Sequence, residues 1–276
     1  MQTILVPTDF SKNANSAFKY ALEFAKSLKA KIILLHAFES PVIYSDIPLT
    51  TVQFDYAMLH DAAVKKMNNY FRQIQDSLEG VKVELTVQQG LASARIIETA
   101  HERKADLIVM GATGASAMER VLVGSNANRV IKNAPCMVMA IPPKAKFDGI
   151  NKIVFTTDLS DENLEHAQSL IPFAKKFGAE ILFLTVENIF NDEEIEIEAM
   201  NKKIKKFVKY PRMSGFLCAD LSVTEGITYF LKEHNVDILA MYTHHRNVFQ
   251  QLFNKSITKK IALHTTVPLL VIHKND

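Results

Sequence analysis

The chain has 276 residues, long enough for two domains that each bury their own core, and 48% of the residues are hydrophobic. This composition excludes disordered, collagen-like and disulfide-stapled classes of protein. A formal net charge of +2 argues against a nucleic-acid partner, because a surface that neutralises phosphates needs a clear basic excess. The N-terminus lacks a signal-peptide pattern, and no apolar run approaches the roughly 20 residues of a membrane span. We therefore expect no membrane partner and a cytoplasmic location.

Short apolar runs rich in β-branched residues alternate with segments of helical periodicity along the first half. We expect buried parallel strands at residues 3–7, 31–37, 81–87, 106–110 and 136–141. We expect helices at about 14–28, 53–78 and 92–103, the first capped by Ser11 and the second within a long insert at 39–80. This alternation predicts a parallel sheet with right-handed crossovers and helices on both faces.

The second half of the sequence repeats the first. Residues 4–11 correspond to 153–160 at an offset of 149, and 105–110 correspond to 236–241 at an offset of 131. The smaller offset means that the second copy has lost residues in its middle. Internal repetition of this kind predicts the same fold twice. We expect two tandem doubly wound α/β domains, each with a mostly parallel five-stranded sheet and helices on both faces. We place these domains at residues 1–143 and 150–276.

The segment after the fourth predicted strand carries the clearest chemical signal. It reads Gly111-x-x-Gly114, then nine residues, then Gly124-Ser125 and the start of a helix. Glycines let the backbone approach phosphate oxygens closely and adopt positive φ angles. The first turn of a helix offers unpaired N–H groups and a positive dipole end to an anion. Because open α/β sheets bind ligands beyond the carboxyl ends of their strands, the segment predicts a phosphate-binding loop.

This spacing resembles the G-x2-G-x9-G-[S/T] signature of the ATP-binding branch of the universal stress protein family. The resemblance extends over both copies and includes Pro7-Thr8-Asp9-x-Ser11 at the end of the first strand. Walker-type and dinucleotide-type glycine patterns are absent from the sequence. The resemblance implies an adenine nucleotide alpha hydrolase-like, Rossmann-like fold, with ATP as the ligand, alone or with Mg²⁺.

The resemblance also implies a role for each matching residue in the first copy. The glycines, Ser125 and the Asn126 backbone would hold the phosphates and the ribose, and Asp9 would accept hydrogen bonds from the ribose hydroxyls. The adenine would lie between the first strand and the backbone of Ala37, with Met110 beside the nucleotide. The implied set is Pro7, Thr8, Asp9, Ala37, Met110, Gly111, Gly114, Gly124, Ser125 and Asn126.

Two plainer interpretations stay open at these positions. Asp9 lies two residues before Ser11, so its carboxylate could serve only a turn or a helix cap. The three glycines could belong to an ordinary connecting loop. No catalytic residue and no metal ligand is assigned.

The second copy departs from the pattern. Tyr242, His245 and Lys255 stand where the first copy has glycines, and Ser256 alone keeps the loop residue. Each replacement adds a side chain where phosphates would lie and removes easy access to positive φ. Asp158 and Val186 persist at the ribose and adenine positions. We expect this copy not to bind ATP in the family manner.

Two interpretations of the altered loop remain. His244, His245, Arg246 and Lys255 could form a cationic pocket for another anion, or they could be solvated side chains left after degeneration. A metal site at the paired histidines is disfavoured, because adjacent residues point apart and no further ligand cluster is evident.

The last strands of the two copies offer a way to join them. Members of the family that the sequence resembles dimerise through their last strand, and strands at 136–141 and 269–273 could pair within one chain. Such pairing would cover two edges that otherwise invite aggregation. The chain would then resemble a covalently linked dimer, with a further homodimer left open.

Three functional classes follow. The first, which we favour, is a nucleotide-binding stress regulator that changes its contacts with partners. The second is an enzyme such as a slow ATPase, for which Glu119 and Arg120 are the nearest candidate groups, although we favour the plainer interpretation of an exposed pair on a mobile loop. The third is a nucleotide-independent scaffold or small-molecule binder. We expect binding without efficient turnover.

Overall fold

The computed structural model describes residues 1–39, 49–113, 124–143, 145–188, 196–220, 222–243 and 267–273, without the side chains of 49–56, 188 and 243. Outside these ranges lie Gly114, Glu119, Arg120 and the cationic group of the second copy at 244–246 and 255. Within the described ranges, no helix has both the length and the apolar character that a membrane crossing demands.

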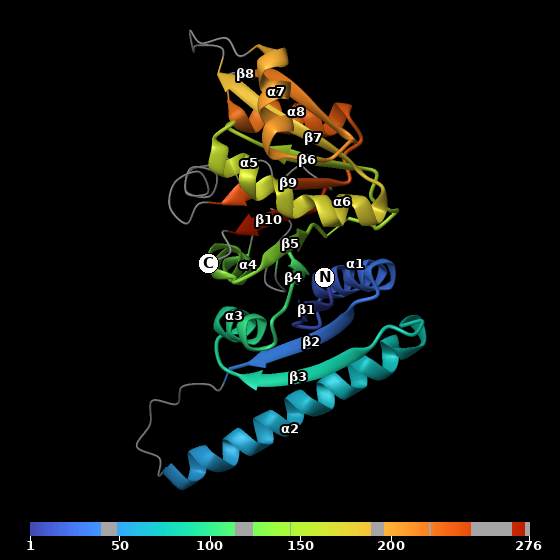
Figure 1. Cartoon of the computed structure of the whole chain (residues 1–276). Coiled ribbons are helices and arrows are strands. Elements are labelled where there is room, and N and C mark those ends of the chain that lie inside the picture. Colours follow the sequence, from blue (N-terminus) through green and yellow to red (C-terminus); the bar gives the residue numbers. More distant parts are fainter. Residues whose placement is uncertain are drawn as a thin grey trace.

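The first half alternates strands and helices as predicted (Figure 1). Its elements are β1 (Thr3–Pro7), α1 (Lys12–Leu28), β2 (Lys31–Phe38), α2 (Leu49–Ile74), η1 (Gln75–Ser77), β3 (Val83–Gln89), α3 (Ala92–Glu102), β4 (Leu107–Gly111), α4 (Ser125–Asn133) and β5 (Met137–Ile141). The helix expected at 53–78 is thus observed as α2 with a short 3-10 turn after it. It runs alongside β3 at one end of the molecule (Figure 1).

The second half follows the same order. Its elements are β6 (Lys152–Thr156), α5 (Asp161–Ala167), η2 (Gln168–Leu170), α6 (Ile171–Phe177), β7 (Glu180–Asn188), α7 (Ile197–Phe207), β8 (Met213–Asp220), α8 (Val223–Glu233), β9 (Ile238–Thr243) and β10 (Leu269–His273). The counterpart of α1 is here divided into α5, η2 and α6. Pro172 lies in the first turn of α6, and proline favours such a break because it has no N–H and clashes with the preceding turn.

The ten strands form one sheet in the order β3-β2-β1-β4-β5-β10-β9-β6-β7-β8. The strands of each half are parallel, whereas β5 and β10 pair antiparallel with Leu270 opposite Met139. The predicted pairing of the two last strands is therefore confirmed. The two predicted five-stranded sheets are the halves of a single continuous sheet, and the predicted α/β fold class is confirmed.

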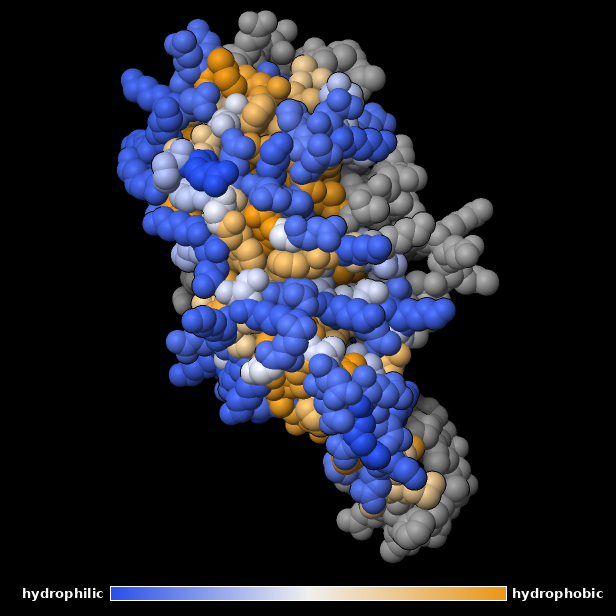
Figure 2. Space-filling model, turned by 90° about the vertical axis from the view of Figure 1, so that its right-hand side faces the viewer, coloured by the Kyte–Doolittle hydropathy of each residue, from blue (hydrophilic) through white to orange (hydrophobic). Residues whose placement is uncertain are grey.

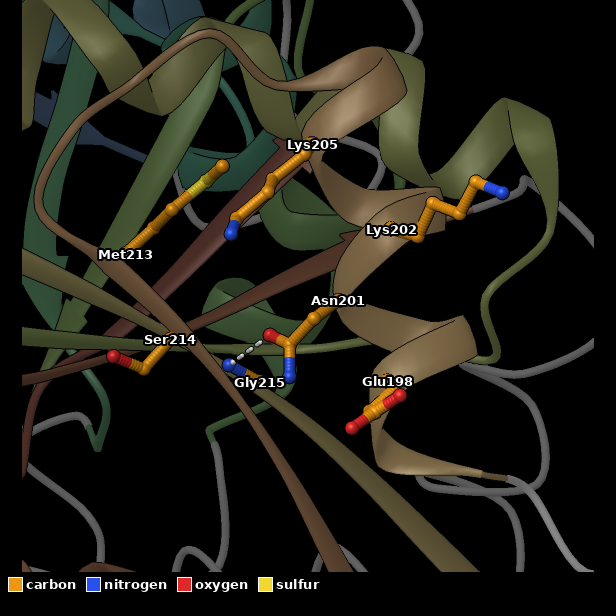
Figure 3. Close-up of a pocket in the computed structure, with 7 residues that line it drawn as sticks. All are labelled: Glu198, Asn201, Lys202, Lys205, Met213, Ser214 and Gly215. Carbon is orange, nitrogen blue, oxygen red and sulfur yellow. Dashed lines mark hydrogen bonds between the residues drawn. The ribbon is translucent and has the colours of Figure 1, made fainter.

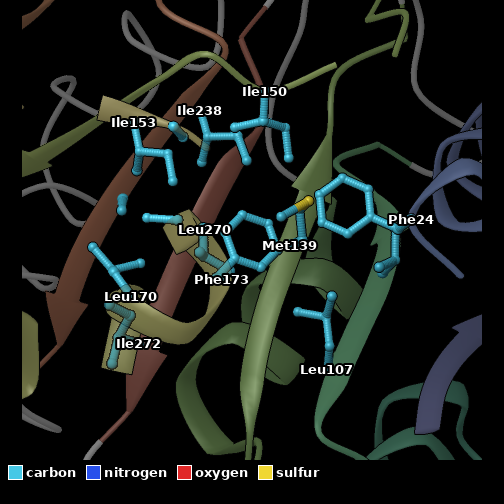
Figure 4. Packing of buried hydrophobic residues seen from close by; sticks show 14 of the residues in the cluster. Phe24, Leu107, Met139, Ile150, Ile153, Leu170, Phe173, Ile238, Leu270 and Ile272 are labelled. Carbon is cyan, nitrogen blue, oxygen red and sulfur yellow. The ribbon is translucent and has the colours of Figure 1, made fainter. Parts of the chain in front are cut away.

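The two faces of the sheet are packed differently. On the face covered by α1, α2, α5, α6 and α7, one hydrophobic cluster runs through both halves. Side chains of Phe24, Met139, Phe173 and Leu270 lie together in it (Figure 4). On the other face, α3 and α4 cover one cluster and α8 covers a separate one. One face therefore joins the halves into a common core.

Aromatic rings concentrate at the join between the halves. Phe24 of α1 stacks on Phe173 of α6 with ring centroids 5.2 Å apart, and it also meets Phe177 at 5.3 Å. Phe147, in the connection between the halves, lies 5.3 Å from the ring of Phe24. Outside this join, hydrophilic residues cover most of the face in Figure 2, with apolar residues visible between them.

The repeat reaches the level of single backbone conformations. The Ser11 hydroxyl caps α1 by accepting a hydrogen bond from the Ala14 N–H, as predicted, and Ser160 caps α5 in the same way. Both helical segments end in a left-handed residue, Lys29 at φ 55° and Gly178 at φ 66°. Because Lys29 and Gly178 are also 149 residues apart, the duplication preserved the path of the chain as well as the order of its elements.

Replacing Phe24 by alanine should lower the free energy of unfolding by about 3–5 kcal/mol, because the ring is fully buried and contacts both halves. The measurement is urea denaturation followed by circular dichroism. Met58→Ala is the control, since Met58 is 63% exposed and its removal should change little. Equal unfolding midpoints for the two variants would contradict the assignment of Phe24 to the shared core.

Candidate functional site

The strand order reverses between β1 and β4. From β1 the chain continues to β2 on one side, whereas β4 lies on the other side. In open α/β sheets the carboxyl ends of the strands at such a reversal form a crevice that binds ligands. The described site residues predicted from the sequence lie at or just after the end of β1, at the ends of β4 and β2, or at the start of α4, so the fold brings them to this edge.

Backbone and side-chain hydrogen bonds hold the turn after β1. The Thr8 N–H donates to the Leu35 carbonyl at 2.8 Å, which ties the turn to β2. The Thr8 hydroxyl accepts from the Phe10 N–H at 3.0 Å, and Asp9 Oδ1 accepts from the Ser11 N–H at 2.9 Å. The turn role left open for Asp9 is therefore confirmed. Thr8 is buried and Asp9 is exposed, so the turn presents the carboxylate at the surface of the edge.

The same turn occurs after β6 in the second half. The Thr157 hydroxyl accepts from the Leu159 N–H at 2.9 Å, and Asp158 Oδ1 accepts from the Ser160 N–H at 2.9 Å. Leu159 has a left-handed φ of 62°, as Phe10 has a φ of 64°. The second half therefore provides an internal reference for the turn that carries Asp9.

The end of β4 and the start of α4 meet directly. The Gly124 N–H donates to the Ala112 carbonyl at 2.8 Å, while the Ala112 N–H donates to the Ile141 carbonyl at 2.9 Å. The N-cap residue of α4 is Gly124, which has no side chain to occupy the first N–H groups of the helix. Ser125 and Asn126, the first residues of α4, are exposed. The positive end of this helix dipole thus opens beside the end of β4.

Gly111 has a packing role. A Cβ at this position would lie 3.3 Å from the carbonyl oxygen of Asn13 and 3.3 Å from that of Thr113, tighter than most Cβ contacts, so the backbone would have to shift by a few tenths of an ångström. The Asn13 side-chain amide donates to the Thr113 hydroxyl at 2.6 Å. The absence of a side chain at Gly111 therefore allows the first turn of α1 to bind the end of β4.

In the second half, large side chains form the corresponding contact. Tyr242 replaces Gly111, and its hydroxyl donates to Glu162 of α5 at 3.0 Å. Its ring stacks on His166 with centroids 4.1 Å apart. Along β9, Tyr242 shares a face with Ile238 and Ala240, so its bulk is directed under α5. The expectation that this side chain would occupy phosphate positions is therefore wrong, because alternation along β9 places it on the face covered by α5.

The remaining described residues of the predicted set lie close to this edge. Pro7 ends β1 opposite Leu35, and Ala37 is the penultimate residue of β2. Met110 is buried in the cluster under α3 and α4. No group of three or more His, Cys, Asp or Glu side chains suited to a metal ion occurs in the parts of the chain that the structure describes.

Behind the turn lies a cluster of side chains that was not predicted from the sequence. The ring of Phe10 lies 4.5 Å from that of His36 and 5.5 Å from that of Tyr70, and the Lys66 ammonium lies 4.6 Å from the Phe10 ring centre. His36 Nδ1 is 2.9 Å from the carbonyl oxygen of Thr8. One feature of the sequence could have indicated this cluster. Both copies have a polar residue near the end of the apolar second strand, His36 in the first copy and Thr185 in the second.

Burial lowers the pKa of His36 below its ordinary value. The charge of Lys66 acts in the same direction, whereas the Thr8 carbonyl and Asp9 act in the opposite direction. The neutral imidazole is therefore favoured in the folded protein.

A lowered pKa means that the unfolded chain binds a proton to His36 at a higher pH than the folded chain does. The contribution of neutral His36 to the stability of the folded state is thus present above the ordinary histidine pKa of about 6.5. It is lost as the pH falls through the pKa that His36 has in the folded protein. Between pH 7 and pH 5, the free energy of unfolding should fall more in the wild type than in His36→Gln. Urea denaturation at both pH values measures this, and the other histidines cancel in the comparison. Parallel pH profiles would contradict the shift.

A separate groove lies between α7 and β8, far from the predicted site residues in the fold. Its volume is about 610 Å³, and the side chains of Lys205 and Met213 border it (Figure 3). The Gly215 N–H donates to the Asn201 side chain at 3.1 Å, and a Cβ on Gly215 would lie 2.9 Å from that oxygen. Glycine here allows α7 to cover part of the outer edge of β8.

Comparisons with known proteins agree with this architecture. The model of the universal stress protein family matches residues 1–142 and 217–273. A universal stress protein of Methanocaldococcus jannaschii is 32% identical over 146 residues, which cover 52% of this chain and 83% of that protein.

Two solved structures resemble the whole chain. The crystal structure of a universal stress protein from Archaeoglobus fulgidus has a TM-score of 0.69 at 19% identity, covering 99% of this chain and 97% of that one. A functionally unknown protein from Pseudomonas aeruginosa has a TM-score of 0.63 at 15% identity, covering 100% and 94%. At these identities the likeness concerns the fold alone.

Proposed function

The chain belongs to the universal stress protein family, and from that premise we propose that its first half, residues 1–143, binds an adenine nucleotide, with ATP as the expected ligand. The second half, residues 150–276, lacks such a site in this proposal. It serves instead as the covalently attached partner whose last strand completes the sheet.

The observation that carries the proposal is the hydrogen bond from the Gly124 N–H to the Ala112 carbonyl. It draws the open N-terminus of α4 to the end of β4, beside the reversal of strand order. Backbone N–H groups at a helix start attract phosphate because they are both unpaired donors and the positive end of a dipole. The first N–H groups of α4, beginning at Ser125, would thus contact phosphate oxygens beside Gly124, which leaves room for them because it has no side chain, with Gly114 completing the loop.

Asp9 supports the proposal from the other side of the reversal. Its Oδ1 atom is engaged by the Ser11 N–H, which orients the exposed carboxylate at the end of β1. A carboxylate held in this way suits ribose hydroxyls, because a charged acceptor forms the stronger hydrogen bonds. The adenine would then lie toward the end of β2, near the backbone of Ala37.

Nucleotide binding predicts a thermal shift. At 100 times its dissociation constant, ATP should stabilise the protein by about 2.7 kcal/mol, and Gly124→Lys should abolish the effect by placing a long side chain at the start of α4. Gly124 has φ −59° and ψ 152°, which any residue can adopt, so the fold should persist. Differential scanning fluorimetry with ATP, ADP and AMP provides the measurement.

Ala219→Lys is the matched control, because it adds the same side chain at an exposed position of β8 at the far end of the sheet. A full nucleotide shift in Gly124→Lys would refute the assignment of the loop. If the wild-type protein responds to none of the three nucleotides, the chain is a nucleotide-independent scaffold or a binder of another small molecule.

Asp9→Asn should weaken ATP binding about tenfold or more, because the side chain keeps its Oδ1 acceptor for the Ser11 N–H and loses its charge. Isothermal titration calorimetry gives the affinity. Asp158→Asn makes the identical change in the matching turn of the second half and should leave the affinity unchanged. Equal losses in the two variants would count against a nucleotide site in the first half alone.

A further inference from the structure

His36 occupies an unexpected place for a polar side chain. It follows Ile32 and Leu34 on the face of β2 that packs beneath α1 and α2, where both of those residues are fully buried. The imidazole itself is partly buried. A polar group in such a place needs a hydrogen-bond partner, since an unpaired buried donor or acceptor loses its hydration without compensation.

The partner is the backbone of the turn that carries Asp9. His36 Nδ1 lies 2.9 Å from the Thr8 carbonyl oxygen. Because a carbonyl can only accept, the proton resides on Nδ1 and the imidazole donates. Thr8 is then held at three atoms, since its N–H bonds to Leu35 and its hydroxyl bonds to the Phe10 N–H. The residue immediately before Asp9 is thereby fixed in position.

Phe10 closes the turn in a conformation that bulky residues seldom adopt. Its φ of 64° is left-handed, a conformation that is unfavourable for a residue with a Cβ because the Cβ approaches the following carbonyl oxygen. Its ring is packed against His36 and Tyr70, and the Lys66 ammonium lies over it. These contacts stabilise the strained residue, so His36 supports the turn through both its ring and its N–H group.

The second half shows which of these two contributions is retained. Thr185 replaces His36, and its hydroxyl donates to the Thr157 carbonyl at 3.0 Å, the same bond to the same atom of the turn. The strand register is also the same, with Pro7 opposite Leu35 and Thr156 opposite Leu184. The aromatic ring has disappeared while the donor has been kept. The position therefore needs a hydrogen-bond donor to the turn.

We propose that His36 is a positioning residue for the nucleotide: its Nδ1–H, bonded to the Thr8 carbonyl, sets the orientation in which Asp9 meets the ribose. This inference rests on the proposed function. His36 acts through Thr8 and Asp9, and its contribution to binding is the geometry of the carboxylate. The equivalent bond in the second half, from Thr185 to the Thr157 carbonyl, supports a turn to which the proposed function assigns no nucleotide.

The test compares two replacements of equal size. His36→Thr restores the donor that the second half uses, whereas His36→Val has the same shape without a donor, and both residues suit a strand. By isothermal titration calorimetry, His36→Thr should bind ATP within about threefold of the wild type, and His36→Val should bind about tenfold more weakly, as expected when a displaced Asp9 carboxylate loses one hydrogen bond to the ribose. Both affinities are measured at a temperature at which each variant is fully folded, so that the difference does not reflect unfolding.

Thr185→Val is the control, since it removes the same hydrogen bond from the second half. It should lower the unfolding temperature and leave the ATP affinity unchanged. If the His36 bond were purely structural, His36→Val would behave in the same way and lose stability without losing ATP affinity. If His36→Thr and His36→Val bind ATP equally well or equally poorly, the inference is wrong while the nucleotide site stands. If the wild-type protein binds no adenine nucleotide, the proposed function and this inference fail together.

Discussion

The antiparallel pairing of β5 with β10 is the interaction on which the rest of the structure depends. Each strand is the last of its half, and each would otherwise be an open edge beside a hydrophobic core. Pairing them buries Val138 and Val271 completely on one face and allows the cluster that contains Met139 and Leu270 to run across the join on the other. Because the pairing is antiparallel, the carboxyl ends of the strands next to the join lie at opposite edges in the two halves. The two repeated turns are thereby kept apart, and each half presents its own edge.

Duplication preserved the backbone in this chain more faithfully than the side chains. The turns after β1 and β6 share their hydrogen bonds and their left-handed residue, although Phe10 stands in one and Leu159 in the other. By contrast, the contact of α1 with β4 and the corresponding contact of α5 with β9 use entirely different side chains. The first half uses the missing side chain of Gly111, and the second uses the ring of Tyr242. Backbone hydrogen bonds must be satisfied in any variant, whereas a packing gap can be filled in several ways.

This division has a consequence for the proposed site. The groups assigned to the nucleotide are mostly backbone N–H groups and one carboxylate held by a turn, so their positions depend on the framework behind them. His36, Phe10 and the α2 side chains Lys66 and Tyr70 form that framework in the first half. The long helix α2 thus has a direct packing connection to the turn that presents Asp9.

The sequence by itself determined the elements, the repeat, the Ser11 cap, the family signature and the candidate pairing of the last strands. These follow from residues that are close along the chain or from comparison of one copy with the other, and periodicity and spacing record them directly. Only the tertiary structure decided that α1 touches Gly111, that Tyr242 turns under α5, and that His36 bonds to Thr8. Each of these contacts joins segments separated by a strand or a helix, and its geometry depends on strand register and on the face to which a side chain is directed. Linear sequence records which residues are present, whereas the order and twist of the sheet determine which of them meet.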